Sequence, residues 1–241
     1  MTYYDIKRIS NSDLTQLKYQ LMGMEYRFSQ KAYSFGSVLH EMLLEPDTFQ
    51  GIPENVDNKL INTLFNQVAS DKVCRWYLQF SRKEAVHFFD DSDTGLPCKA
   101  KLDIIYRNHT ILDFKTTSCR NYAEFVRRCQ DYDYDRQAAF YLDAVGAKRF
   151  IFVGIQKLKP FSLFHFEATA HPGFVEYGRR KYKFLLRKWK ENQLLSAYDT
   201  STAISTIAPK AKSQQLTVLT KEVIIPDWEE NPPLAPPRRG F

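Results

Sequence analysis

The chain has 241 residues, of which 44% are hydrophobic and 15% aromatic, and this length and composition predict one globular domain with a large core. Its 34 basic and 28 acidic residues give a net charge of +6, which suits a polyanionic partner without requiring one. The first 25 residues lack the apolar stretch of a signal peptide and no later run is long enough to span a bilayer, so we expect a cytoplasmic protein that makes no membrane contact.

The first 80 residues are expected to be helical in three places. N-cap residues near Ser10 precede leucines at helical spacing, so the first helix is predicted to begin there. A second helix is predicted over residues 34–44, before Pro46, and a third over residues 56–80.

The remaining pattern alternates strands and helices. Strands are predicted over residues 84–89, 98–106, 110–116, 149–156 and 162–168. Helices are predicted over residues 122–129, 134–145 and 173–191. We assign residues 1–195 to one domain that includes the N-terminal helices, and the Ser-, Lys- and then Pro-rich residues 196–241 to a linker and a flexible tail.

The second and third predicted strands carry two carboxylates and a lysine. Side chains alternate along a strand, so Asp113 and Lys115 share one face of the third strand. A tight turn centred on Asn108 would bring Asp103 opposite Asp113. Two like charges in that position destabilise a hairpin unless something neutralises them, and a divalent cation is the simplest neutraliser. The hairpin therefore predicts a metal site with a lysine beside it.

Three further features accompany the hairpin. His40 lies on the second predicted helix one turn after Gly36, although a lone helical histidine is more often structural. Gln137 and Tyr141 share one helix face, where they orient a phosphate or a water, or simply form a polar edge. Glu84 on the first predicted strand adds a carboxylate near the metal or lies on the surface.

These residues occur in a recognisable order, namely Gly36-x3-His40, Glu84, Asp103, Asp113-x-Lys115 and Gln137-x3-Tyr141. The set resembles the PD-(D/E)xK nuclease superfamily, and within it the phage-type exonucleases, the group of lambda exonuclease, exonuclease VIII and the RecB nuclease domain. The resemblance covers residues 9–168 and implies a restriction-endonuclease-like α/β core, in which a mixed sheet of about five strands is flanked by helices. Leu102 and Asp113 depart from the proline and glutamate of many members.

The resemblance implies a role for each matched residue. Asp103, Asp113, the backbone carbonyl of Phe114 and His40 would bind one or two Mg²⁺ or Mn²⁺ ions, and Lys115 would position the attacking water. Gln137 and Tyr141 would hold the substrate or the water and complete the catalytic set. No iron–sulfur cluster is expected, because the branch that carries one has three cysteines after the catalytic core and this chain has none after Cys129.

The resemblance also implies a substrate. We expect a metal-dependent exonuclease that resects double-stranded DNA ends from 5′ to 3′ for recombination, in a bacterium or a phage-infected cell. A single-strand annealing protein and a ring of three or four copies are its expected partners. Two alternatives remain, a structure- or sequence-specific endonuclease and an inactive nucleic-acid-binding protein of the same fold.

Basic side chains outside the motifs are candidates for DNA contacts. They lie after the third predicted strand and on the last predicted helix: Arg120, Arg127, Arg128, Arg179, Arg180 and Lys183. On a nuclease such residues would contact backbone phosphates, although a charged helix face is more often only solvated.

Overall fold

The computed structural model describes residues 3–25 and 30–205. Its helices are η1 (Tyr3–Asp5), α1 (Asn11–Leu21), α2 (Gln30–Leu44), α3 (Asn58–Ser70), α4 (Lys72–Phe80), α5 (Tyr122–Asp131), α6 (Tyr134–Val145), η2 (Ala168–Ala170) and α7 (Phe174–Ser205). Its strands are β1 (Arg82–Asp90), β2 (Pro97–Tyr106), β3 (Thr110–Thr117), β4 (Arg149–Gln156) and β5 (Leu163–Glu167). Within the described ranges, no helix combines the length and the apolar character that crossing a bilayer requires.

The five strands form one mixed sheet in the order β1-β2-β3-β4-β5. β3 and β4 are parallel, because α5 and α6 carry the chain back between them, and the other neighbours are antiparallel. The predicted α/β fold with a mixed sheet of about five strands flanked by helices is therefore confirmed.

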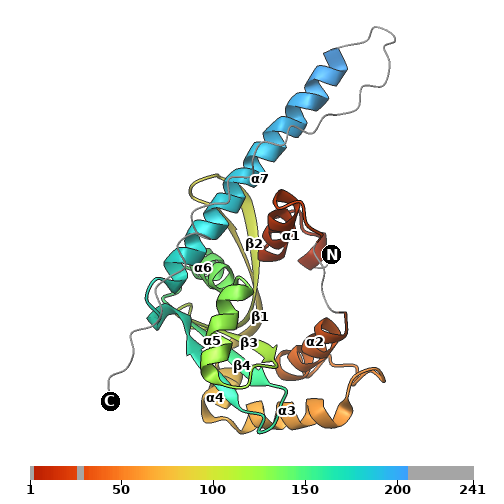
Figure 1. Cartoon of the computed structure of the whole chain (residues 1–241), viewed down its shortest axis with the longest axis vertical. Helices are drawn as coiled ribbons and strands as arrows, with labels where there is room; N and C mark the ends of the chain where they lie inside the picture. The colour runs from red at the N-terminus through yellow and green to blue at the C-terminus, as the bar shows by residue number, and fades with distance from the viewer. Residues whose placement is uncertain (1–2, 26–29, 206–241) are drawn as a thin grey trace.

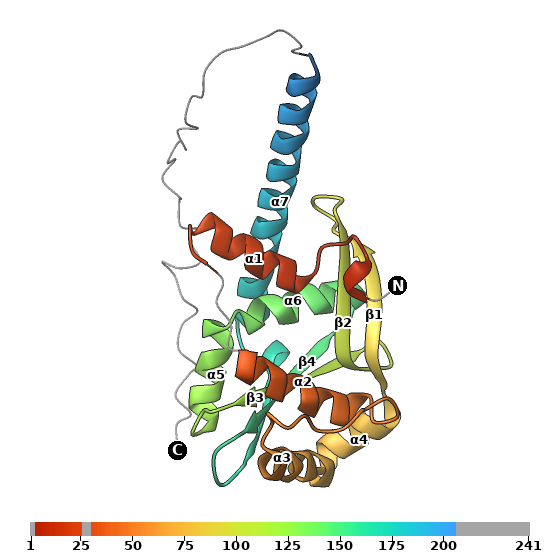
Figure 2. The same cartoon turned by 90° about the vertical axis from the view of Figure 1, so that its right-hand side faces the viewer.

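Helices cover both faces of the sheet, so the molecule has three layers (Figures 1 and 2). α1, α5, α6 and α7 bury one set of apolar side chains against one face, with Phe125, Phe140, Phe152 and Tyr182 among them. α2, α3 and α4 bury a second set against the other face, around Phe114. Because β3 contributes Ile111 to the first set and Leu112 to the second, its residues face the two cores alternately.

The β2–β3 hairpin has the predicted turn and register. Arg107 and Asn108 adopt left-handed backbone conformations with φ of 50° and 53°, which a tight hairpin turn requires. Pairing continues from Tyr106–Thr110 to Ile104–Leu112. The next pair in this register would be Asp103–Asp113, where the recorded pairing ends.

Two helices differ from the prediction by more than a few residues. The single helix expected over residues 56–80 is two helices, because Asp71 is extended and its carboxylate accepts a hydrogen bond from the amide of Cys74, which caps α4. The last helix continues past the expected domain boundary at residue 195 to Ser205. In Figures 1 and 2 the C-terminal part of α7 extends beyond the other layers. The proposed tail from residue 206 onward lies outside the described residues.

Candidate active site

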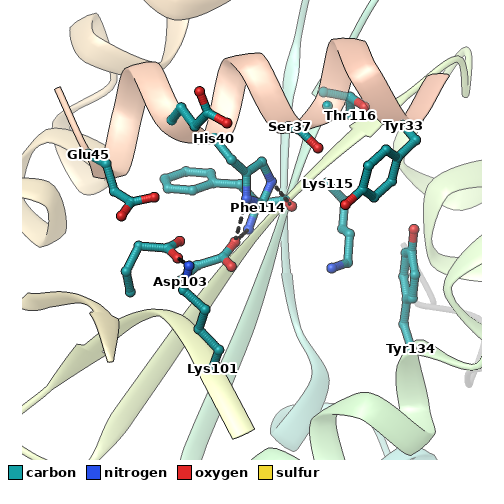
Figure 3. Close-up of a pocket in the computed structure, with 13 residues that line it drawn as sticks. Tyr33, Ser37, His40, Glu45, Lys101, Asp103, Phe114, Lys115, Thr116 and Tyr134 are labelled. Atoms are coloured by element: carbon teal, nitrogen blue, oxygen red, sulfur yellow. Dashed lines mark hydrogen bonds and ion pairs between the residues drawn. The ribbon is translucent and has the colours of Figure 1, made fainter. Parts of the chain in front are cut away.

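A pocket of about 460 Å³ opens between α2 and the strands β1, β2 and β3 (Figure 3). It is lined by Tyr33, Gly36, Ser37, His40, Glu41, Glu45, Glu84, Lys101, Asp103, Phe114, Lys115, Thr116 and Tyr134. Five of the sequence-predicted residues are in this lining: His40, Glu84, Asp103, Phe114 and Lys115. Elements far apart in the sequence thus contribute to one concave site.

Asp103 lies where β2 and β3 stop pairing. Its Oδ2 accepts a hydrogen bond of 2.9 Å from the amide of Phe114, so the side chain satisfies a β3 donor beyond the end of the β2–β3 pairing. The same Oδ2 is 3.4 Å from Nδ1 of His40, whose Nε2 donates a hydrogen bond of 2.8 Å to the carbonyl oxygen of Phe114. His40, Asp103 and the main chain of Phe114 are therefore in mutual contact.

Asp113 lies under the pocket, with 1% of its surface exposed. Its Oδ1 is 2.5 Å from Nζ of Lys115, and its Oδ2 accepts a hydrogen bond of 2.8 Å from Nε2 of Gln137 on α6. Asp113 and Lys115 therefore share one face of β3, as predicted, and Gln137 on α6 fixes the Asp113 carboxylate there. Tyr134, one turn before Gln137, places its ring centroid 5.0 Å from the Lys115 ammonium.

The positive charges in the site do not fully compensate the carboxylate of Asp103. Burial and the charge of Asp113 together raise the pKa of Asp103 to about 6, although His40 and Lys115 act in the opposite direction. Burial alone would lower the pKa of Lys115, but Asp113 and Asp103 outweigh it and raise that pKa, so the ammonium stays charged. One lysine therefore serves two neighbouring carboxyl groups.

The donor set fits a hard divalent cation. His40, Glu84 and Asp103 each offer a ligand atom, and these atoms lie within 4.8 Å of one another. Carboxylate oxygens and the nearby carbonyl oxygen of Phe114 are ligands that Mg²⁺ and Mn²⁺ prefer, and the imidazole nitrogen of His40 is a softer donor beside them. Glu84 is in addition paired with Lys101. Asp113 is outside this group and reaches the site through Lys115 and through its charge.

Tyr141 is close to the site but is not part of the pocket lining. Its ring contacts Phe140 and Phe150, with centroids 6.2 Å and 6.4 Å away, and burial and the charge of Asp113 raise the pKa of its hydroxyl. Gly36 lines the pocket, but a side-chain carbon added there would be 3.7 Å from Oγ1 of Thr116, an ordinary contact. The structure therefore does not require glycine at this position for a close backbone approach.

Several lining residues were not predicted from the sequence. Tyr33, Ser37 and Glu41 follow one another at intervals of four along α2, which is the spacing of one helix face, and Glu45 continues the interval just past the end of the helix. Their helical spacing relative to His40 could have predicted that they face the same site. Tyr134, at i−3 from Gln137, carried the same kind of signal.

The basic candidates for DNA contacts lie outside the pocket. Arg120, Arg127 and Arg128 are exposed in and before α5. On α7, Arg179 makes a two-pronged ion pair with Asp143 on α6, and Lys183 pairs with Asp91, so these two charges are committed to internal partners.

Arg180 is exposed, and its guanidinium is 5.4 Å from the ring of Tyr177. α7 packs on the face of the sheet opposite to α2, so the sheet separates α7 from the α2 side of the pocket.

One solved structure among those similar to this chain has the same fold. A solved structure from Eubacterium rectale, named a predicted exonuclease, superposes with a TM-score of 0.58 at 14% identity and covers 92% of this chain and 98% of that chain. A phage-related exonuclease from Haemophilus somnus 129PT has a TM-score of 0.41 at 12% identity, covering 78% of this chain and 84% of that chain. No curated protein matches the sequence. The model of the PDDEXK-like domain of unknown function (DUF3799) matches residues 5–194, and the chain belongs to this family.

Proposed function

We propose that the protein is a metal-dependent nuclease that hydrolyses phosphodiester bonds in DNA. The observation that supports this most directly is the contact of Asp103, His40 and the main chain of Phe114 in a pocket that also holds Lys115. A carboxylate, a carbonyl oxygen and a neighbouring ammonium are what hydrolysis of a phosphodiester needs, namely ligands for a cation and a charge near the scissile phosphate.

The proposed roles follow from the contacts. His40, Asp103, the carbonyl of Phe114 and, at the rim, Glu84 would hold Mg²⁺ or Mn²⁺. When bound, such an ion lowers the pKa of water and offsets charge on phosphoryl oxygens.

The residues around Asp113 act on orientation and charge. Lys115 would direct its ammonium at the water or at a phosphoryl oxygen, and Asp113 would keep that ammonium charged and in place. Gln137 would fix the Asp113 carboxylate, which makes Gln137 a positioning residue. Tyr141 would support the same wall from the core.

The finer proposal is an exonuclease that resects double-stranded DNA ends, with 5′ to 3′ polarity and a role in recombination. It is supported by the resemblance of the motifs to phage-type exonucleases and by the name of the Eubacterium rectale protein, which shares this fold. A ring of copies and an annealing partner belong to the same proposal.

Hydrolysis of linear duplex DNA in Mg²⁺ or Mn²⁺ tests the nuclease proposal. Asp113→Ala and Lys115→Ala should each abolish hydrolysis, whereas Asp90→Ala and Lys188→Ala, which remove exposed charges outside the pocket, should retain it. Undiminished activity of both site variants would disprove the assignment. A protein that neither cleaves DNA nor binds Mn²⁺ in a calorimetric titration would instead be an inactive binding protein.

Two substrates resolve the finer proposal. An exonuclease leaves a covalently closed circular duplex intact, so cleavage of the circle would identify an endonuclease. Duplexes labelled separately at each 5′ and 3′ end report the polarity, and loss of the 5′ label first is the expected result.

A further inference from the structure

Helix α4 exposes apolar side chains on the face that is turned away from the core. Val73, Trp76 and Phe80 recur at i, i+3 and i+7, and they are 45%, 41% and 55% exposed. The core-facing positions of the same helix are Cys74 and Tyr77, which are buried. An exposed tryptophan and phenylalanine beside each other are costly to leave in water, and such patches mark interaction sites.

Trp76 is held in place by neighbouring rings. Its centroid is 5.0 Å from that of Tyr77 and 4.7 Å from that of Tyr106 at the end of β2, with near-perpendicular or steep ring planes. On the outer side Phe80 lies 5.6 Å away. We call Trp76, Phe80 and Tyr106 the α4 aromatic patch. Because its rings are already fixed, little side-chain entropy remains to be lost on binding.

Positive charge predominates near the α4 aromatic patch, although Asp71 caps the start of the helix. α4 contains Lys72 and Arg75 and no acidic residue, and Lys72 shares the face of Trp76 at i+4. Beyond the helix, Arg82 donates a hydrogen bond to Oδ1 of Asn108, and the guanidinium of Arg107 is 5.0 Å from the ring of Tyr106. Aromatic faces between cations are the arrangement that binds unpaired bases and their phosphates.

The α4 aromatic patch is connected to the pocket by two strands. On β1, Arg82 is two residues from the pocket residue Glu84, and on β2, Tyr106 is three residues from Asp103. At roughly 3.3 Å per residue these separations are about 10 Å or less along the strands, which one or two nucleotides bridge.

We infer that the α4 aromatic patch with Arg82 and Arg107 binds a single-stranded segment of the DNA substrate by base stacking. This inference rests on the proposed function for the identity of the DNA but not for the stacking. Paired bases present no free faces, so the aromatic surface favours unpaired nucleotides over duplex. A second copy of the chain is a poorer occupant, because a two-fold contact through this patch would bring like charges together.

The test uses a fluorescein-labelled oligothymidylate of 20 nucleotides, with anisotropy measured in EDTA so that no hydrolysis occurs. Trp76→Ala and Phe80→Ala should each weaken binding about tenfold, since stacking contributes roughly 1–3 kcal/mol per base and about 1.4 kcal/mol is tenfold. Phe88→Ala is the matched control, because Phe88 is also about half exposed but lies on β1 outside the patch. Thermal unfolding of each variant verifies that it is folded.

Charge variants add an independent readout. Arg82→Gln with Arg107→Gln should lower the slope of log affinity against log salt by about 0.7 per lost phosphate contact. Binding of a 20-base-pair duplex should be unchanged in Trp76→Ala. Equal affinity of all variants for the oligothymidylate, or no binding by the wild type, would overturn the inference.

The remaining outcomes separate this inference from the function. If Trp76→Ala lowers the molecular mass in sedimentation, the patch joins copies of the chain and the inference fails. If the wild type binds the oligothymidylate through Trp76 but cleaves no DNA in Mn²⁺, the nuclease proposal fails while the patch assignment holds.

Discussion

Two clusters in this molecule each place a pair of carboxylates around a lysine, one beside the pocket and one in the core. In the first, Asp103 and Asp113 share Lys115 beside the pocket. In the second, between α6 and α7, Asp133 and Asp135 both contact Lys181, each at 2.9 Å.

The clusters differ in their supply of cations. Lys18 adds a second contact of 2.9 Å to Asp133. Burial would raise the pKa of Asp133, but Lys181, Arg136 and Lys18 outweigh burial and lower it to about 2. At the pocket, burial and Asp113 raise the pKa of Asp103 to about 6. The α6–α7 cluster is neutralised by the protein itself, whereas the pocket cluster has room and chemistry for one more cation.

The largest expected effect separates the two lysines. Lys181→Met leaves two carboxylates buried in the core and should lower the free energy of unfolding by about 3–5 kcal/mol, the cost of breaking a buried ion pair. Lys115→Met should cost less than this, because Lys115 is 19% exposed at the pocket and Asp113 keeps its hydrogen bond from Gln137. Urea unfolding measures both losses, and equal losses would show that the two clusters do not differ in this way.

The next effect concerns the missing cation. Mn²⁺ at one hundred times its dissociation constant should raise the free energy of unfolding of the wild type by about 2.7 kcal/mol. Asp103→Asn should lose this gain, and Asp133→Asn should keep it, since only Asp103 belongs to the pocket. Thermal unfolding with and without Mn²⁺ gives the answer. A gain that survives in Asp103→Asn would mean that the ion binds elsewhere.

A smaller effect follows from the lowered pKa of Asp133. A carboxyl whose folded pKa of about 2 is below its ordinary value of 3.8 stabilises the fold at pH above 3.8, and this contribution disappears as pH falls towards 2. Asp133→Asn should therefore be about 2 kcal/mol less stable than wild type at pH 6, and the difference should shrink between pH 4 and pH 2. Part of this difference passes through Asp135, whose pKa is raised by burial and by the charge of Asp133, so Asp133→Asn also lowers the pKa of Asp135. A difference that is constant with pH would contradict the assignment.

The parts of the structure that were predictable from sequence are those encoded by local periodicity. The Asn108 turn fixed the β2–β3 register, and alternation along β3 put Asp113 and Lys115 on one face. The spacing of Gln137 and Tyr141 likewise put both on one face of α6, although the contact of that face with Asp113 is a tertiary one. In each case neighbours in sequence determine the geometry.

The parts that were not predictable depend on distant partners. Arg179 and Lys183 were expected to face DNA, yet their partners Asp143 and Asp91 lie on other elements, and no local pattern records that pairing. The break at Asp71 depended on one capping carboxylate within an otherwise helical pattern, a signal too short for periodicity to detect.

The smallest effect concerns the packing around the glycine that lies near each cluster, Gly178 and Gly36. At Gly178, a side-chain carbon would be 1.9 Å from the carbonyl oxygen of Asp135, so α7 approaches α6 only because this residue is glycine. At Gly36 on α2, the same carbon would meet only Oγ1 of Thr116, at 3.7 Å. Gly36→Ala should therefore raise the free energy of unfolding by about 0.5–1 kcal/mol, because alanine is the better residue inside a helix. Urea unfolding measures this gain, and a loss of stability instead would mean that the α2 side of the pocket is as tightly packed as the α6–α7 contact.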